Sequence, residues 1–312
     1  MGNKNCSSGD LLKFLPADIL NPMKVIRARV LGYCMGVKRA VEAAESLISN
    51  KNDESPAKYT LGPLIHNPSV LESLRERGMA VLKPADIPQI QCGSEVVIRA
   101  HGTTPRILEE LEQKGATIID ATCPKVHLSQ KRVREWSRKG YSVIIAGDRN
   151  HGEVTSISGY CDFSEKGGNV TVVQNREEAL RTNVPEKSIL IAQTTFSPVE
   201  FEEIRKILTL KNPEIKVFSS ICSATMERQN ALSELQGRID GVLVIGGKDS
   251  ANTRRLFESA QARFAKAALI ETAKDIPEDF YALEKIGLTA GASTPDSVIE
   301  QVEKSLLQNS TK

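Results

Sequence analysis

Three cysteines that are far apart in the sequence each stand between a strand-like run and a helix-like run. Cys34 follows residues 25–33, Cys123 follows 116–122 and Cys222 follows 216–221, and apolar residues recur at helical spacing after each cysteine. In α/β folds, ligands bind at the carboxyl ends of parallel strands. The three thiols therefore predict one shared site, built by three similar units about a pseudo-threefold axis.

The repetition extends beyond the cysteines, because each unit carries two further strand-like runs that end in polar residues. Continuous apolar runs such as 142–147 and 242–246 indicate parallel strands covered on both faces. Each third strand ends in a hydroxyl residue followed by proline, which is typical of the N-cap and first position of a helix. These hydroxyl residues are Thr104, Ser197 and Thr294. The pattern predicts an α/β fold with mostly parallel sheets and nine strands, three in each unit.

The spacing of the cysteines divides the 312 residues into three units of ordinary domain size. We expect units at 23–122, 123–220 and 221–312. Residues 1–22 do not resemble a secretory signal, because Lys13, Pro16 and Asp18 interrupt their apolar stretch. We expect these residues to be a disordered N-terminal extension or an upstream mis-start, with translation beginning at Met23.

Composition excludes several classes of partner. Lys and Arg number 41 against 39 for Asp and Glu, and only 4% of residues are aromatic, so no nucleic-acid partner is expected. No run approaches the roughly 18 apolar residues of a membrane-spanning helix, so no membrane association is expected. Six cysteines without a secretory signal indicate a reducing compartment, and we expect a cytoplasmic protein.

Three converging thiolates without a fourth suit a [4Fe–4S] cluster in which one iron is open to substrate, since electron-transfer clusters usually have all irons ligated by protein. An open iron is a Lewis acid that can hold a hydroxyl or a carboxylate. A three-cysteine zinc site is the competing interpretation, although zinc sites usually use closely spaced pairs. Cys92 and Cys161 fit small buried apolar residues, and Cys6 lies in the extension.

Three of the four histidines, His66, His101 and His151, fall at predicted strand ends, whereas His127 lies in a helix and has a structural interpretation. Imidazoles, hydroxyls, an amide and several helix N-termini together indicate a phosphate site. Glu153 is the best candidate proton donor, with a solvated loop glutamate as the alternative. The other polar residues at the strand ends are Asn67, Thr194, Thr195, Ser250, Asn252, Ser293 and Thr294.

Nine ordered segments resemble the LytB family of 4-hydroxy-3-methylbut-2-enyl diphosphate reductases. They cover the chain from about residue 30 to 296: GYCMGVKRAV, IHNPSVLESL, AHGTTP, DATCPKV, NHGEV, AQTTFSP, CSATMERQ, GGKDSANTRRL and TAGASTPD. The resemblance implies a trefoil of three α/β units around an oxygen-sensitive [4Fe–4S] cluster held by Cys34, Cys123 and Cys222. It also implies the last step of the non-mevalonate isoprenoid pathway, a two-electron reductive dehydroxylation.

Roles for the polar residues are likewise implied by the resemblance. Glu153, with Thr194 and His151 nearby, would deliver a proton to the substrate hydroxyl, which binds the open iron and leaves as water. The products would be isopentenyl and dimethylallyl diphosphates, and ferredoxin or flavodoxin would donate the electrons. The diphosphate would be held by His66, His101, Ser250, Asn252 and Ser293, and His151 and Thr194 would also bind the substrate. The segment after Glu153, residues 154–170, departs from the family's usual sequence.

Two other functions remain open from the residues alone. A non-redox cluster enzyme of similar trefoil shape, such as quinolinate synthase, would use the iron only as a Lewis acid and would be expected to place arginines at the strand ends. A non-catalytic module that binds a phosphorylated metabolite would carry its thiols as buried apolar groups and would be colourless after anaerobic purification.

Overall fold

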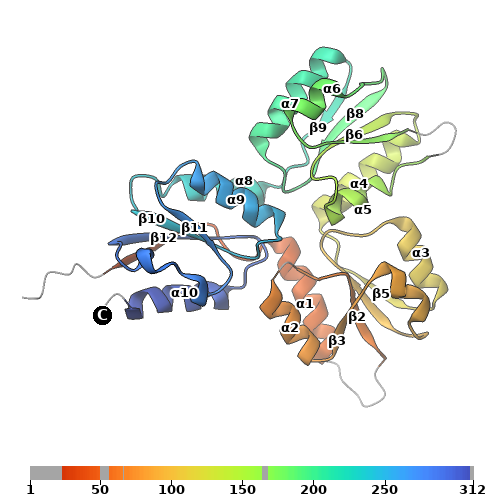
Figure 1. Cartoon of the computed structure of the whole chain (residues 1–312). Helices are drawn as coiled ribbons and strands as arrows, with labels where there is room; N and C mark the ends of the chain where they lie inside the picture. Colours follow the sequence, from red (N-terminus) through yellow and green to blue (C-terminus); the bar gives the residue numbers. More distant parts are fainter. Residues whose placement is uncertain (1–22, 50–55, 66, 164–167, 310–312) are drawn as a thin grey trace, which may run out of the picture.

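The computed structural model describes residues 23–49, 56–65, 67–163 and 168–309. The chain forms three lobes that meet at a common centre (Figure 1). Each lobe is built on a four-stranded sheet in which all strand pairs are parallel. This arrangement confirms the predicted α/β class with three repeated units. The expected extension at 1–22 lies outside the described residues.

The first unit has the strand order β3-β2-β4-β5. Its helices α1 and α2 cover one face of the sheet, and α3 with a 3-10 segment covers the other. The elements are α1 (Met35–Ser49), β2 (Lys58–Leu61), α2 (Pro68–Glu76), β3 (Met79–Leu82), the 3-10 segment Pro84–Gln89, β4 (Glu95–Ile98), α3 (Pro105–Gln113) and β5 (Thr117–Asp120).

The second unit repeats this order as β7-β6-β8-β9. Helices α4 and α5 cover one face, and α6 and α7 cover the other. The elements are α4 (Pro124–Ser137), β6 (Ser142–Ala146), α5 (Gly152–Ser158), β7 (Val170–Val173), α6 (Arg176–Arg181), β8 (Ser188–Ala192), α7 (Pro198–Lys211) and β9 (Lys216–Phe218).

The third unit has the equivalent order β11-β10-β12-β1, so its last strand comes from the start of the described chain. Helices α8 and α9 cover one face and α10 covers the other. The elements are β1 (Lys24–Arg27), α8 (Ser223–Ser233), β10 (Gly241–Ile245), α9 (Ala251–Gln261), β11 (Ala267–Ile270), the 3-10 segments Ala273–Asp275 and Glu278–Phe280, β12 (Lys285–Ala290) and α10 (Asp296–Asn309).

The position of β1 corrects the expected division of the chain. The predicted unit 23–122 would place this strand in the first sheet, whereas Ile26 is paired with Gly287 of β12 in the third sheet. In each unit the strand before a cysteine ends one sheet, and the helix after it packs on the next sheet. Each cysteine therefore lies at a junction between two units.

Twelve strands occur in the described residues, whereas nine were predicted. The additional strands are β3, β7 and β11, each of which forms the edge of its sheet. These strands have four residues each. The hydrophobic pattern did not reveal them.

The central strands supply most of the core, because their side chains alternate between two covered faces. On β4, Val97 packs with α1, while Val96 and Ile98 pack with α3 on the other side. Each sheet has two apolar clusters of this kind. The rigid sheets therefore hold their polar strand ends in fixed positions at the centre of the molecule.

Two of the three predicted helix starts agree with the structure. Thr104 and Ser197 are the N-caps of α3 and α7, and each is followed by proline. The third differs, because α10 begins at Asp296 and the Thr294 hydroxyl donates instead to the Ile245 carbonyl at 2.9 Å. Among the helices in the described ranges, none is both long and apolar enough to cross a bilayer.

Candidate active site

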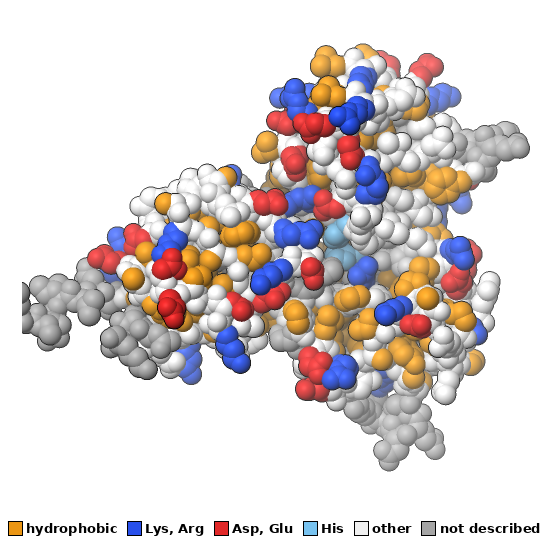
Figure 2. Space-filling model, viewed as in Figure 1, with side chains coloured by type: hydrophobic (Ala, Val, Ile, Leu, Met, Phe, Trp, Pro, Cys, Tyr) orange, Lys and Arg blue, Asp and Glu red, His pale blue; other side chains and the backbone are white. Residues whose placement is uncertain are grey.

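One cavity lies where the carboxyl ends of the three sheets meet, and histidine side chains are visible there in the space-filling view (Figure 2). Ten predicted site residues line this cavity: Cys34, His101, Cys123, His151, Glu153, Thr194, Cys222, Ser250, Asn252 and Ser293. The eleventh, His66, lies outside the described residues. The three units therefore bring together residues that are up to 259 positions apart in the sequence.

The three cysteines have equivalent backbone positions. The N–H of Cys34 donates to the Ala292 carbonyl at 3.1 Å, beyond the end of β12. In the same way Cys123 donates to Ala100 at 3.0 Å, beyond β4, and Cys222 donates to Thr194 at 2.8 Å, beyond β8. Cys123 and Cys222 are the N-caps of α4 and α8, and Cys34 immediately precedes α1. Each thiol thus stands at a helix N-terminus.

The electrostatics of Cys123 show that the three thiols interact. Burial raises the pKa of the Cys123 thiol, and the charges of Cys34 and Cys222 raise it further. The backbone N–H groups of Lys125 and Val126 act in the opposite direction. Among the described residues, no three His, Cys, Asp or Glu side chains form a metal-ion site. The thiols of Cys34, Cys123 and Cys222 line one cavity, and they are the candidate ligands for a metal–sulfur group in it.

Glu153 is held by Thr194 through both carboxylate oxygens. The Thr194 N–H donates to Oε1 at 2.6 Å, and the Thr194 hydroxyl donates to Oε2 at 2.7 Å. Glu153 is only 1% exposed, and burial raises its pKa to about 7 despite these hydrogen bonds. A carboxyl with this pKa is able to give and take a proton near neutral pH. The alternative of a solvated loop glutamate is wrong.

Two histidines lie side by side at the boundary between the first and second units. His151 is the N-cap of α5, and its Nδ1 accepts the Glu153 N–H at 3.2 Å. In a neutral ring the Nε2–H is therefore the donor. The His101 and His151 rings meet edge to face, with centroids 4.8 Å apart. This contact joins the loop after β4 to the loop after β6.

The third unit contributes buried polar atoms that lack a partner within the described residues. Asn252 Nδ2 and Ser293 Oγ are both buried without a hydrogen bond there, although both residues line the cavity. The Ser250 hydroxyl is the N-cap of α9 and accepts the Thr253 N–H at 3.3 Å. Because buried polar groups are normally satisfied, these two atoms are candidate contacts for a polar ligand.

Three polar residues of the cavity wall were not predicted: Lys125, Thr225 and Arg228. Arg228 is 3% exposed, donates to the Gly32 and Ala224 carbonyls, and has an Nε atom without a partner in the described part of the chain. Burial lowers the Arg228 pKa, while the charges of Cys34 and Cys222 raise it. These residues occur two, three and six positions after a cysteine, on α4 and α8, and nothing in the sequence pattern distinguished them from other polar helix residues.

The residues assigned structural roles lie away from the cavity lining. His127 contacts Asp120 at 3.2 Å and Gln130 at 2.9 Å. Cys161 is buried in the core of the second unit, as expected, whereas Cys92 is exposed rather than buried. Of the segment 154–170, residues 154–158 complete α5 and residues 164–167 are outside the described ranges.

The fold and the cavity define a three-unit α/β protein with one central site to which each unit contributes a thiol. The LytB protein family model matches residues 25–307. The chain belongs to this family, which confirms the resemblance seen in the sequence.

Similarity to characterised proteins extends over nearly the whole chain. The 4-hydroxy-3-methylbut-2-enyl diphosphate reductase of Treponema denticola is 45% identical over 294 residues, covering 92% of this chain and 100% of that protein. The enzyme of the same name from Thermoanaerobacter pseudethanolicus is 39% identical over 285 residues, covering 91% of this chain and 96% of that protein.

Two solved structures are also similar. The E-1-hydroxy-2-methyl-but-2-enyl-4-diphosphate reductase from Plasmodium falciparum matches with a TM-score of 0.82 and 29% identity, covering 91% of this chain and 87% of that one. A second structure, described as (E)-4-hydroxy-3-methyl-but-2-enyl diphosphate reductase and the terminal enzyme of the non-mevalonate pathway, matches with a TM-score of 0.66 and 37% identity. It covers 92% of this chain and 99% of that one.

Proposed function

We propose that this protein reduces 4-hydroxy-3-methylbut-2-enyl diphosphate to isopentenyl and dimethylallyl diphosphates, the last step of the non-mevalonate pathway. The observation that carries this proposal is the joint placement of three thiols and a buried, near-neutral carboxyl in one cavity. Membership of the LytB family supports this proposal. Relatives named 4-hydroxy-3-methylbut-2-enyl diphosphate reductase, at 39–45% identity, support it as well.

Cys34, Cys123 and Cys222 would hold a [4Fe–4S] cluster, and no fourth cysteine lines the described cavity. The donor set fits such a group, since iron–sulfur clusters are held by thiolates and each thiol here stands at a helix N-terminus. The glycine at position 36 also leaves room for a cluster beside the thiol of Cys123. A Cβ at this position would lie 2.9 Å from Cys123 Sγ, so a side chain would crowd the thiol. When bound, the cluster supplies electrons and a Lewis-acidic iron.

The diphosphate would be bound by Asn252, Ser293 and Ser250 of the third unit together with His101 and His151. Asn252 Nδ2 and Ser293 Oγ are donors without another partner among the described residues, which supports this assignment. Lys125 and Arg228 add positive charge to the cavity wall. His66 is a further candidate from the sequence.

Glu153, held by Thr194 and beside His151, would supply a proton. The overall reaction consumes two electrons and two protons: a C–O bond breaks, one proton completes the departing water, and a C–H bond forms with the other. Thr194 fixes both oxygens of Glu153, so its proton is presented from a defined position. A ferredoxin- or flavodoxin-type protein would supply the electrons.

The non-redox alternative is less well supported. A carboxylate substrate favours bidentate arginines at the strand ends. Arg228 is the only arginine among the described residues of the lining, and two of its nitrogens donate to backbone carbonyls.

Anaerobic purification followed by visible spectroscopy and a viologen oxidation assay tests the proposal. We expect a coloured protein that oxidises reduced viologen only when the hydroxylated diphosphate is added. Replacing any one of the three cavity cysteines with serine should abolish colour and turnover, whereas Cys161→Ser should retain both. A colourless wild-type protein, or a coloured one without substrate-dependent oxidation, would contradict the proposed activity.

Glu153→Gln tests the proton-delivery role separately. We expect this variant to keep its visible spectrum and its substrate affinity, but to lose at least about a hundredfold in turnover, as is typical for removal of a general acid. Substrate binding is measured by calorimetry on the anaerobic protein. Turnover equal to that of the wild type would remove Glu153 from the reaction and leave the other assignments unchanged.

A further inference from the structure

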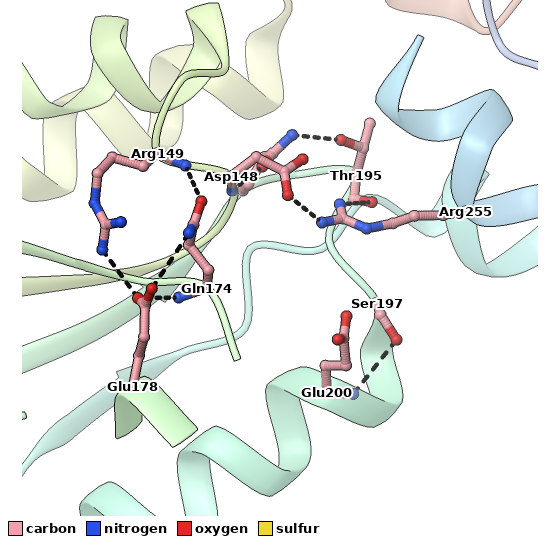
Figure 3. Close-up of polar contacts among 9 residues, drawn as sticks. Asp148, Arg149, Gln174, Glu178, Thr195, Ser197, Glu200 and Arg255 are labelled. Carbon is pink, nitrogen blue, oxygen red and sulfur yellow. Dashed lines mark hydrogen bonds and ion pairs between the residues drawn. The ribbon is translucent and has the colours of Figure 1, made fainter. Parts of the chain in front are cut away.

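An ion pair just behind the cavity joins the third unit to the second. Arg255 of α9 donates to Asp148 Oδ1 at 2.8 Å and to the Thr195 carbonyl at 2.7 Å, and both contacts are visible in Figure 3. The Arg255 side chain is only 13% exposed. Its guanidinium also lies over the buried Phe196 ring, 4.6 Å from the centroid. Three different contacts therefore fix one guanidinium.

The segment that Arg255 holds is the turn at residues 193–196, which carries Thr194. Gln193 ties this turn to the loop after β6: its Oε1 accepts the Asp148 N–H and its Nε2 donates to the Thr195 hydroxyl, both at 2.9 Å. The Thr194 N–H and hydroxyl donate hydrogen bonds to Glu153, while the Thr194 carbonyl accepts the Cys222 N–H. Movement of this turn would displace both the carboxyl and a thiol.

The charges of the ion pair act on Glu153 in opposite directions. Arg255 lowers the pKa of Glu153 and Asp148 raises it. Arg255 also lowers the pKa of Glu200, which burial raises. The other titratable or charged groups around this network are His151 on the same loop as Asp148, His101 on the loop after β4, Glu258 on α9 and Glu203 on α7.

We propose that Arg255 and Asp148 are positioning residues for Glu153: they hold the 193–196 turn across the boundary between two units and set the charge that surrounds the carboxyl. This role rests on the proposed function, in which Glu153 delivers a proton. Neither residue lines the described cavity, so both act through Thr194 and Thr195 rather than on the substrate.

The test compares turnover as a function of pH in Arg255→Gln, Arg255→Lys and Asp148→Asn, all with the cluster loaded. In the wild type, kcat should fall as pH rises through the pKa of Glu153. Loss of the Arg255 charge should move this midpoint up by about half a unit to one unit, and loss of the Asp148 charge should move it down. Arg255→Lys should stay near the wild type, and KM should change less than kcat.

Arg254→Gln is the matched control, because Arg254 is the neighbouring arginine on α9 and is exposed. It removes the same charge from the same helix and should leave the midpoint unchanged. Infrared difference titration of the Glu153 carboxyl, assigned with Glu153→Gln, gives the same midpoints without turnover and should shift with the same signs.

Opposite shifts in Arg255→Gln and Asp148→Asn support the proposal, since damage to a purely structural ion pair would affect both variants alike. Shifts in the same direction, or no shift in either variant, would overturn it. If the pH dependence disappears in Glu153→Gln while the two variants match the wild type, only the positioning role fails. If Glu153→Gln turns over normally, both this role and that of Glu153 fail.

Discussion

At the scale of single residues, Glu153 shows how burial changes the chemistry of an ordinary carboxyl. It is the only acidic residue of the described cavity lining, and its pKa is raised to about 7 because water is excluded from it. The two hydrogen bonds from Thr194 stabilise the charged form only in part. Glu153 is therefore neutral in the folded protein over a pH range in which an exposed glutamate is ionised.

This shift predicts a pH dependence of stability. Because the folded protein binds a proton that the unfolded chain releases above its pKa of about 4.5, the free energy of unfolding should fall as pH rises from about 4.5 to 7. At 1.36 kcal/mol per pKa unit, this contribution is on the order of 3 kcal/mol. Urea unfolding of the wild type and Glu153→Gln across this range measures it.

In Glu153→Gln this component should be absent, so the difference in stability between the two proteins should itself depend on pH. A difference that stays constant from pH 4.5 to 8 would contradict the raised pKa. Thr155→Ala is a suitable control, because this residue lies two positions further along α5 and is exposed.

Residues at strand ends could be predicted from the sequence, and residues on helix sides could not. Cys222 and Glu153 lie in the segments that follow β9 and β6, so the fold class alone places them at the centre. Arg228 and Arg255 come from the sides of α8 and α9, and the way these helices pack decides what they reach. The sequence pattern does not contain that information.

At the scale of elements, the first turn of α1 packs closely against Cys123, the cysteine that leads into the next unit. A Cβ at Gly36 would lie 2.9 Å from Cys123 Sγ and 3.1 Å from its Cβ, which is too close for ordinary contact. Glycine at this position therefore allows the helix N-terminus and the second thiol to face the same cavity. Glycine is required at position 36 because of this close approach and not because of an unusual backbone conformation.

We predict that Gly36→Ala lowers cluster content more than it lowers stability. The added methyl group must displace either Cys123 or the start of α1, and a displacement of that size disturbs the spacing of the ligands. Iron content and visible absorption after anaerobic reconstitution, together with thermal unfolding, measure the two effects. Met35→Ala is the control, because Met35 begins the same helix but is 72% exposed. Equal iron content in Gly36→Ala and the wild type would contradict the prediction.

The edge strands β3, β7 and β11 were the elements least visible in the sequence. On β3, Met79 and Leu82 are buried while the two residues between them are exposed, so the strand does not alternate. Pairing with the neighbouring central strand determines its conformation. Central strands such as β8 and β10 were predictable because most of their residues are apolar and all of them are buried.

At the scale of the whole molecule, β1 closes the ring of units. The last strand of each sheet leads into the cysteine and the helix of the next unit, and in the third sheet this strand is β1. The beginning and the end of the described chain therefore belong to one unit, as Figure 1 shows. The sequence-based division failed here because it cut the chain into consecutive pieces.

This topology predicts where a mutation in β1 has its effect. Ile26→Ala should lower stability by roughly 2 kcal/mol, near the lower limit for Ile→Ala in a core, because Ile26 is only partly buried. Hydrogen exchange should show faster opening of β10 and β12 in the third unit, although β1 directly precedes the first unit in sequence. Ile119→Ala on β5 is the matched variant, because Ile119 is also partly buried and packs in the first unit. Faster exchange of β2 and β4 in Ile26→Ala would contradict the assignment.

The contacts between units differ in chemistry, although the units are equivalent in topology. Between the first and second units, the neutral Ser156 hydroxyl donates to the Thr103 carbonyl at 3.1 Å and accepts from Gln130 at 2.8 Å. Between the second and third units, a charged pair formed by Arg255 and Asp148 has the comparable position.

The sequence by itself determined the class of fold, the threefold repetition, the three thiols and most polar residues of the cavity. These features follow from local patterns. The periods of strands and helices, and the polar ends of parallel strands, can be recognised within short stretches of sequence. Only the tertiary structure decided that β1 completes the third sheet, that Glu153 is buried deeply enough to hold a proton, that Arg228 lines the cavity, and that Arg255 reaches the turn behind it. Those outcomes depend on packing between segments distant in the chain, which no local pattern specifies.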